Sequence, residues 1–214
     1  MSGVMVSPTE SQPRVSWFEL FYDLVLVAAI LHGSHVFSEA PSWESGTWLA
    51  ITLLLMLTVW MLTTLTFNSV RDDWAPRRFL ALLQMLALVV ASLSISRADG
   101  VSDRLGFFAL FVTFATIAVL YAMKVRGVAV DRRGSTTLAI GSVAAAFVFF
   151  LGSVLPESTA PLLENPSTYV LGLGIALAVI PMFAINLGKL TASGEIDRDH
   201  LAERMGQIVI IALG

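Results

Sequence analysis

The sequence predicts an all-α polytopic membrane protein with six transmembrane helices, the start of a seventh, and a cytoplasmic N-terminus. Hydrophobic residues make up 56% of the 214 residues and charged residues only 14%, whereas about a quarter of the residues of a soluble domain are charged. The apolar residues come in runs of about 20, the length at which a helix crosses a hydrocarbon core. Basic residues are concentrated in alternate loops. These three observations favour a multi-pass protein of the inner (plasma) membrane.

Six full spans can be placed along the chain, each bounded by polar residues or by proline. We expect them at residues 17–37, 48–67, 78–96, 105–125, 136–155 and 169–187. A short acidic loop that contains Glu39 and Glu44 is expected between the first two spans. Pro181 removes a backbone hydrogen bond inside the sixth span, so we expect a kink there.

The chain ends in an apolar run that is too short to cross a bilayer. From Met205 to Gly214 it has ten residues, which is about 15 Å of helix and half of a hydrocarbon core. We therefore expect residues 1–16 to be a cytoplasmic tail and 17–190 a six-helix bundle. Residues 191–214 would be a polar linker and a truncated seventh helix, completed by a missing C-terminal half of the same chain.

The orientation follows from the charge of the loops. Only Arg97 and Arg104 lie on one side of the predicted bundle, and the other 11 of the 13 basic residues share the side of the N-terminal tail. Cytoplasmic loops carry the excess of Lys and Arg, which places the N-terminus in the cytoplasm. The lipid bilayer is thus the expected partner, and a homo-oligomer is left open.

Composition and motifs exclude several classes of function. The net charge of -3 gives no basic footprint for nucleic acid. The chain has no cysteine, which excludes disulfides and thiolate metal sites. It contains no phosphate-binding loop, nucleophile elbow or zinc-protease motif. We therefore expect no cofactor, no metal and no catalytic residues.

Two carboxylates stand inside the first predicted span. Glu19 and Asp23 are four residues apart and share one face of a helix. A charge in a membrane helix costs at least about 2.5–3.5 kcal/mol, so such residues are usually functional or paired. Either they handle an ion or a proton, or they form an ionic lock with an Arg or His of another helix.

A second charged stripe begins the truncated seventh helix. His200, Glu203, Arg204 and Gln207 are spaced to share one helical face. Glu203 and Gln207 stand 184 residues after Glu19 and Asp23, and an aliphatic run follows each pair. This spacing fits a parallel internal repeat of six helices, in which Arg204 could pair with Glu19 or Asp23. The alternatives are a chance similarity of two aliphatic helices and contacts within one helix start.

Other polar side chains are predicted to lie in the cytoplasmic half of the spans. These are Asn68, Gln84 and Asn186, and with the two charged stripes they would either line an inward-facing vestibule or hydrogen-bond helices together. His32 and His35 lie at the outer end of the first span, off the carboxylate face. Their i, i+3 spacing could hold a metal, but no acidic partner is nearby in the sequence and we expect them to be interfacial.

The two charged stripes resemble the hallmarks of a known family. Residues 16–27, Ser-Trp-Phe-Glu-Leu-Phe-Tyr-Asp-Leu-Val-Leu-Val, closely resemble the opening motif of the bacterial low temperature requirement A family. Residues 200–214 resemble its second hallmark, His-x-x-Glu-Arg-Phe-Gly with an aliphatic run, and His35 matches a common histidine. Leu26, Met205 and Gln207 depart from the motifs. The resemblance implies a multi-pass membrane protein named for a growth phenotype, without a settled activity.

Three hypotheses of function remain from the sequence. The first is transport of an ion, a proton or a small solute through a polar cavity that faces the cytoplasm. This function would be linked to stress or to growth at low temperature. The second is a membrane accessory or structural protein whose charges only lock helices together. The third, an intramembrane enzyme, lacks any visible nucleophile and base.

Overall fold

A computed structural model describes residues 17–69, 75–95, 101–126, 132–155 and 166–184, together with Gly206. Every regular element in these ranges is an α-helix. The six long helices are α1 (Trp17–Glu39), α2 (Trp43–Ser69), α3 (Ala75–Ile95), α4 (Val101–Arg126), α5 (Arg132–Val154) and α6 (Pro166–Ala184). Five of them contain stretches of 20 to 23 residues that are apolar enough to cross a membrane, and α6 adds the shorter apolar stretch Tyr169–Phe183. The chain is therefore an all-α polytopic membrane protein.

Each of the six expected spans contains a helix, and five of these helices begin before the apolar run. For example, α2 begins at Trp43 rather than at 48, and α4 begins at Val101 rather than at 105. The prediction of an acidic loop was wrong, because Glu39 is the last residue of α1 and Glu44 lies inside α2. Hydropathy marks the part of a helix that suits hydrocarbon, whereas backbone hydrogen bonding continues into its polar flanks.

A serine pair makes the short connection between α1 and α2 possible. The backbone N–H of Ser42 donates to Ser45 Oγ at 2.9 Å, and the N–H of Ser45 donates to Ser42 Oγ at 3.1 Å. This reciprocal pattern is that of a capping box, with serine in place of the usual Glu or Gln at its fourth position. It satisfies backbone donors at the start of α2, so the chain can reverse within residues 40–42.

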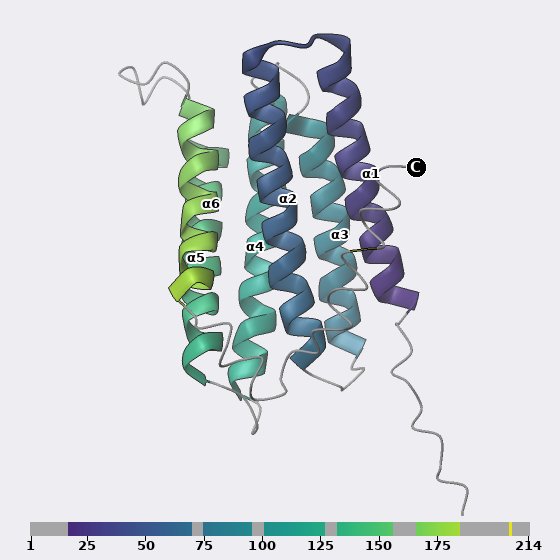
Figure 1. The fold of residues 1–214 in the computed structure, drawn as a ribbon. Coiled ribbons are helices and arrows are strands. Elements are labelled where there is room, and N and C mark those ends of the chain that lie inside the picture. The colour runs from purple at the N-terminus through teal and green to yellow at the C-terminus, as the bar shows by residue number, and fades with distance from the viewer. Residues whose placement is uncertain are drawn as a thin grey trace, which may run out of the picture.

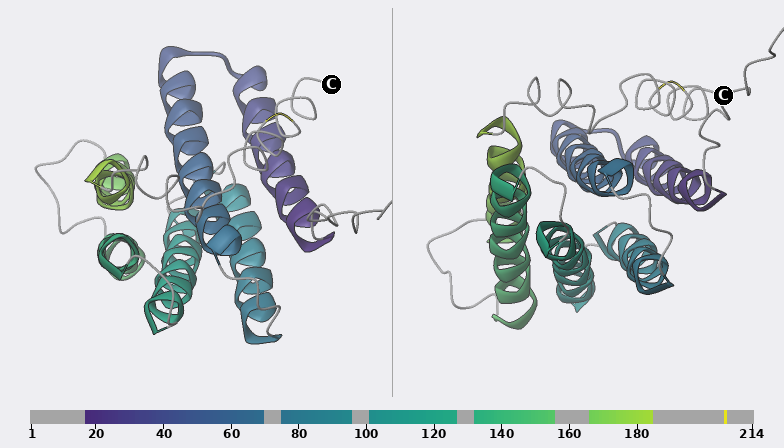
Figure 2. Two further views of the ribbon diagram at one scale, coloured as in Figure 1. Left: turned by 60° about the horizontal axis from the view of Figure 1, so that its bottom comes forward. Right: turned by 90° about the horizontal axis from the view of Figure 1, so that it is seen from below.

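The six helices form two layers of three (Figure 1 and Figure 2). One layer contains α1, α2 and α6, and the other contains α3, α4 and α5. Across the layers α1 packs on α3, α2 on α4, and α6 on α5. The central helices α2 and α4 are the most buried of the candidate spans. This order places the first halves of α1 and α3 beside the last half of α2.

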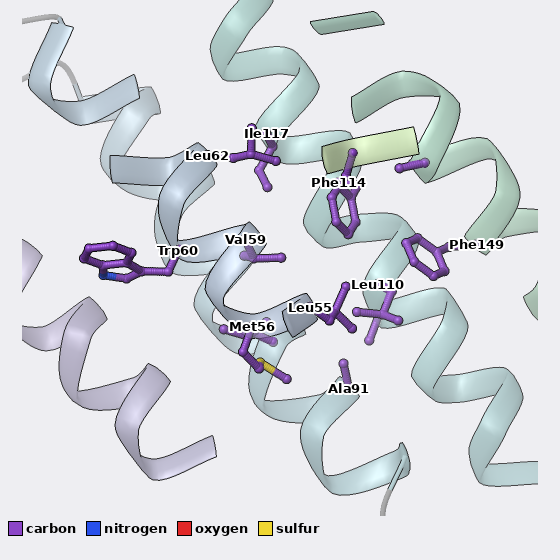
Figure 3. Close-up of a cluster of buried hydrophobic side chains, with 14 of the residues drawn as sticks. Leu55, Met56, Val59, Trp60, Leu62, Ala91, Leu110, Phe114, Ile117 and Phe149 are labelled. Carbon is purple, nitrogen blue, oxygen red and sulfur yellow. The ribbon is translucent and has the colours of Figure 1, made fainter. Parts of the chain in front are cut away.

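An apolar core fills the space between the central helices. In Figure 3, Leu62 of α2 lies next to Ile117 of α4, and Phe114 of α4 lies toward Phe149 of α5. Trp60 belongs to the same cluster and points from α2 toward α1. Large apolar side chains also cover the outer faces, including Phe79, Leu86, Ile140 and Phe183. A surface of this kind is suited to lipid tails rather than to water.

A glycine allows α5 to approach α6 closely. A Cβ atom placed on Gly141 would overlap Pro181 and would lie 2.8 Å from the carbonyl oxygen of Leu177. Leu177 stands four residues before Pro181, so its carbonyl is the one that loses its helical donor. The α5 backbone therefore covers the carbonyl that proline leaves without a helical hydrogen bond.

Candidate functional site

Polar side chains of α1, α2 and α3 meet at the end of the bundle where α1 and α3 begin. We call Tyr22, Asp23, Trp60, Thr63 and Gln84 the polar cluster. Each of the five is at most 3% exposed. Asp23 lies about 9 Å along α1 from Trp17, at 1.5 Å per residue. The cluster is therefore inside the predicted spans, where polar groups need protein partners.

Gln84 connects the three helices. Its Nε2 donates to Tyr22 Oη at 3.0 Å and to Thr63 Oγ1 at 2.6 Å. The Tyr22 hydroxyl donates to Thr63 Oγ1 at 3.2 Å, and the Thr63 hydroxyl donates to the Val59 carbonyl within α2 at 2.7 Å. The hydroxyl hydrogens of Tyr22 and Thr63 thus both have an acceptor, and both amide hydrogens of Gln84 are used.

Asp23 is held by the neighbouring helix. The indole Nε1–H of Trp60 donates to Asp23 Oδ1 at 2.8 Å. Asp23 is 3% exposed and Trp60 is 1% exposed, so the bond lies within the interior. An indole has a donor and no acceptor, so Trp60 is a neutral partner that orients the Asp23 carboxylate.

Further polar contacts surround the cluster at the same end of the bundle. The Tyr121 hydroxyl of α4 donates to the Leu62 carbonyl of α2 at 3.0 Å. Arg77 of α3 donates to the Thr66 carbonyl at 2.8 Å, which satisfies a carbonyl in the last turn of α2. Lys124 is buried on α4. Polar side chains of α1, α2, α3 and α4 thus lie at this end of the bundle.

One acceptor in the cluster lacks a partner. Gln84 is fully buried, and its Oε1 makes no hydrogen bond. The opposite amide orientation is disfavoured because it would place Oε1 against Thr63, whose hydroxyl hydrogen is already given to Val59. Buried acceptors are usually satisfied by protein or by ordered water.

The sequence-predicted site residues divide into described and undescribed groups. The structure brings Asp23 and Gln84 into the same cluster. Glu19 lies in α1 and Asn68 in α2, but their side chains are outside the described part of the structure. The remaining predicted residues also lie outside the described ranges: Asn186, His200, Glu203, Arg204 and Gln207. The proposed contact of the two charged stripes stays a prediction.

The outer-side histidines differ from expectation in one respect. His35 Nε2 lies 3.4 Å from Glu39 Oε1, and the two side chains are 71% and 66% exposed. The prediction that no acidic partner is nearby was wrong, because α1 continues through Glu39 and brings it one turn from His35. His32 is half-buried and is not part of the polar cluster.

Three members of the cluster were missed by sequence reasoning. Tyr22, Trp60 and Thr63 are residue types that are common in apolar spans, and none of them carries a charge. A weak signal existed in α2, where Thr63, Thr64 and Thr66 follow one another closely near the end of the span. Pairing them with Gln84 required the packing of α1, α2 and α3.

Comparison with known proteins finds a family and no individual relative. A family model described as bacterial low temperature requirement A protein (LtrA) matches residues 14–214. No curated protein and no solved structure matches the chain. The family match covers nearly the whole sequence and includes the polar cluster.

Proposed function

The chain belongs to the bacterial low temperature requirement A family, and from that premise we propose that it transports an ion, a proton or a small solute across the membrane. The observation that carries this proposal is the buried carboxylate of Asp23, oriented inside a membrane span by Trp60. Ionisable groups in such positions are costly, and they commonly mark pathways for ions or protons.

The surroundings of Asp23 favour a functional role for its carboxylate over a purely structural one. An indole can be anchored by any neutral acceptor, so holding Trp60 does not by itself require an acid. The neighbouring polar chain of Gln84, Tyr22 and Thr63 already joins the three helices without charge. These helices are thus joined without the carboxylate, and an ionisable group in a membrane span supports a functional role for Asp23.

The side on which this site opens follows from the loop charges. Described basic residues at the same end include Arg77, Arg78, Lys124 and Arg133. By the positive-inside rule this end faces the cytoplasm. The transported species would then exchange between Asp23 and the cytoplasm through the first turns of α1 and α3.

The decisive experiment is flux through the complete protein reconstituted in liposomes. Asp23→Asn removes the charge and keeps an amide oxygen that can accept from Trp60. We expect it to abolish flux while thermal stability stays close to wild type. Glu39→Gln is the matched control, since it neutralises an exposed carboxylate on the same helix, and it should transport normally. Absence of wild-type flux under every ion and solute gradient tested would overturn the proposal.

A helix-locking accessory protein is the second candidate. It is favoured by the Trp60–Asp23 hydrogen bond itself, which ties α2 to α1. Under this alternative Asp23→Asn is silent, and Trp60→Phe lowers stability by about 0.6 kcal/mol, a typical interhelical hydrogen bond in membranes. Exchange of charges in a double variant, Asp23→Arg with Arg204→Asp, tests the predicted ion pair. The prediction of this ion pair is wrong if the double variant folds no better than the single variants.

A further inference from the structure

We propose that the outer face of the layer formed by α3, α4 and α5 binds an anionic phospholipid of the cytoplasmic leaflet. The basic residues at the end of the bundle where α3 and α5 begin would hold its phosphate. This surface is separate from the polar cluster and does not depend on transport. The observation behind it is the unequal division of charges between the two layers of helices.

The charged residues of the six long helices divide by layer. Helices α1, α2 and α6 contain no Lys or Arg, and α1 and α2 contain four of the five acids of the six helices. All seven basic residues of these helices belong to the other layer: Arg77 and Arg78 on α3, Arg104, Lys124 and Arg126 on α4, and Arg132 and Arg133 on α5. The positive-inside rule explains an excess of basic residues at one end of a bundle. It does not explain why they are confined to one layer.

Six of these seven basic residues lie at the same end, where α3 and α5 begin and α4 ends. Within the layer, α4 lies between α3 and α5 (Figure 2). Arg78, Arg132 and Arg133 are exposed at this end, and Lys124 is buried near the end of α4. A lysine can bury its stem in this way and still keep its ammonium group at the interface. The three helices therefore bring positive charge together at one edge of the membrane.

The acids of the neighbouring connections do not cancel this charge. Residues 70–78 and 124–133 contain seven basic and three acidic residues. The three acids, Asp72, Asp73 and Asp131, lie outside the described ranges. By the positive-inside rule this end faces the cytoplasm, where anionic lipids give the membrane a negative surface potential that attracts Lys and Arg. The charges of this surface and of the lipid are therefore complementary.

Exposed apolar side chains continue from the basic residues toward the middle of the membrane. On α3, Phe79, Leu82 and Leu86 follow Arg78 and are exposed, and on α5 the side chain of Ile140 is exposed. A phospholipid has the same order of groups, with a phosphate at the interface and acyl chains in the core. A water-soluble anion would use only the basic residues, so the apolar continuation favours a lipid.

The other layer of the same molecule provides a comparison. Leu20, Phe21 and Leu24 are exposed on α1 at the same end of the bundle, but no Lys or Arg lies on α1, α2 or α6. Acyl chains can therefore contact both layers. Among the described helices, only α3, α4 and α5 offer basic side chains to an anionic headgroup.

The first test maps the lipid contacts of the complete wild-type protein. The protein is reconstituted in vesicles of phosphatidylcholine with a minor share of phosphatidylglycerol, and one of the two lipids has a photoactivatable diazirine near the start of an acyl chain. Mass spectrometry then locates the labelled residues. We expect phosphatidylglycerol to label α3 and α5, near Phe79 and Ile140, in preference to α1. Phosphatidylcholine should label both layers to a similar extent.

The second test removes the exposed charges. Arg78→Gln, Arg132→Gln and Arg133→Gln are made singly and together, and each keeps a polar side chain at an exposed position. We expect the preference for phosphatidylglycerol over phosphatidylcholine to fall by up to about fivefold for each charge removed, because each Lys or Arg near an anionic surface adds to the attraction. Arg104→Gln is the matched control, since Arg104 is exposed on the same layer at the opposite end. It should leave the preference unchanged.

Full retention of the lipid preference in the folded triple variant would overturn the inference. Equal labelling of α1, α3 and α5 by phosphatidylglycerol would do the same, because neither layer would then be preferred. An equal loss of preference in Arg104→Gln would show that only the total charge of the protein matters. Displacement of the labelled lipid by soluble glycerol phosphate would identify a site for a water-soluble anion instead. If the triple variant does not fold, the labelling of the wild-type protein decides.

Discussion

The first three helices and the last three are held together by different forces. Between α1, α2 and α3 the contacts include four side chain to side chain hydrogen bonds of 2.6 to 3.2 Å. Between α4, α5 and α6 the described contacts include aromatic rings and close steric fit. Phe149 lies 5.3 Å from Phe114 and 6.5 Å from Phe107 between ring centroids, and Gly174 of α6 receives the Phe149 ring.

The two kinds of contact contribute differently to the stability of the bundle. In lipid, apolar packing gains little from the hydrophobic effect, so close fit of small and aromatic residues is the main source of helix association. Interhelical hydrogen bonds contribute only about 0.6 kcal/mol each on average. The α4–α5–α6 half is therefore suited to set stability. The polar half contributes less stability than its number of hydrogen bonds suggests.

Removal of the Phe149 ring should have the largest effect on stability. Phe149→Ala leaves a cavity among Phe107, Phe114 and Gly174, and we expect a loss of about 3 kcal/mol, the lower end for Phe to Ala in a core. Phe147→Ala is the matched control on the same helix, because Phe147 is 59% exposed to the lipid side. Unfolding in mixed detergent micelles measures both. Equal losses in the two variants would contradict the assignment of the core.

A methyl group at Gly141 should come next. Gly141→Ala forces α5 away from Pro181 and the Leu177 carbonyl, and overpacking of this kind costs about 1–3 kcal/mol. Gly172→Ala is the control, since nothing lies within 4 Å of its Cβ position. That control should be neutral, or stabilised by up to about 1 kcal/mol through helix propensity. The same mixed-micelle unfolding assay compares them, and a stable Gly141→Ala protein would show that the helices can separate freely.

Loss of the Tyr22 hydroxyl should affect function more than stability. Tyr22→Phe removes an acceptor of Gln84 and a donor to Thr63, for which we expect about 0.6 kcal/mol and a several-fold decrease in flux. Tyr169→Phe is the control, because Tyr169 is 58% exposed. Stability and liposome flux are measured on the same preparations. A large loss of stability with normal flux would reverse the comparison between the two halves.

The exposed His35–Glu39 pair should have the smallest effect. An ion pair of this kind on a helix surface contributes below about 0.5 kcal/mol and is screened by salt. Glu39→Gln should therefore leave the unfolding midpoint nearly unchanged at physiological ionic strength. A clear destabilisation would indicate that the outer end of α1 has a structural role similar to that of its inner end.

The sequence predicted the helices better than it predicted their contacts. Runs of apolar residues indicated all six helices. The helix ends were misplaced because the helices continue into polar residues, as at Glu39 and Trp43. Asp23 and Gln84 were identified because polar groups in an apolar span are conspicuous. Tyr22, Trp60 and Thr63 were not, because aromatic and hydroxyl side chains are ordinary in such spans and only their neighbours reveal their role. The internal repeat and the second charged stripe stay predictions.

By itself the sequence determined the class of protein, its helical spans and the expense of placing Asp23 among them. These follow from the composition and from the thickness of a bilayer, and they do not depend on which residues of other helices lie nearby. Only the tertiary structure decided that Trp60 holds Asp23 and that Gln84 joins three helices and keeps one oxygen without a partner. The reason is physical, since a hydrogen bond between helices depends on which faces meet, and apolar periodicity in lipid does not specify those faces.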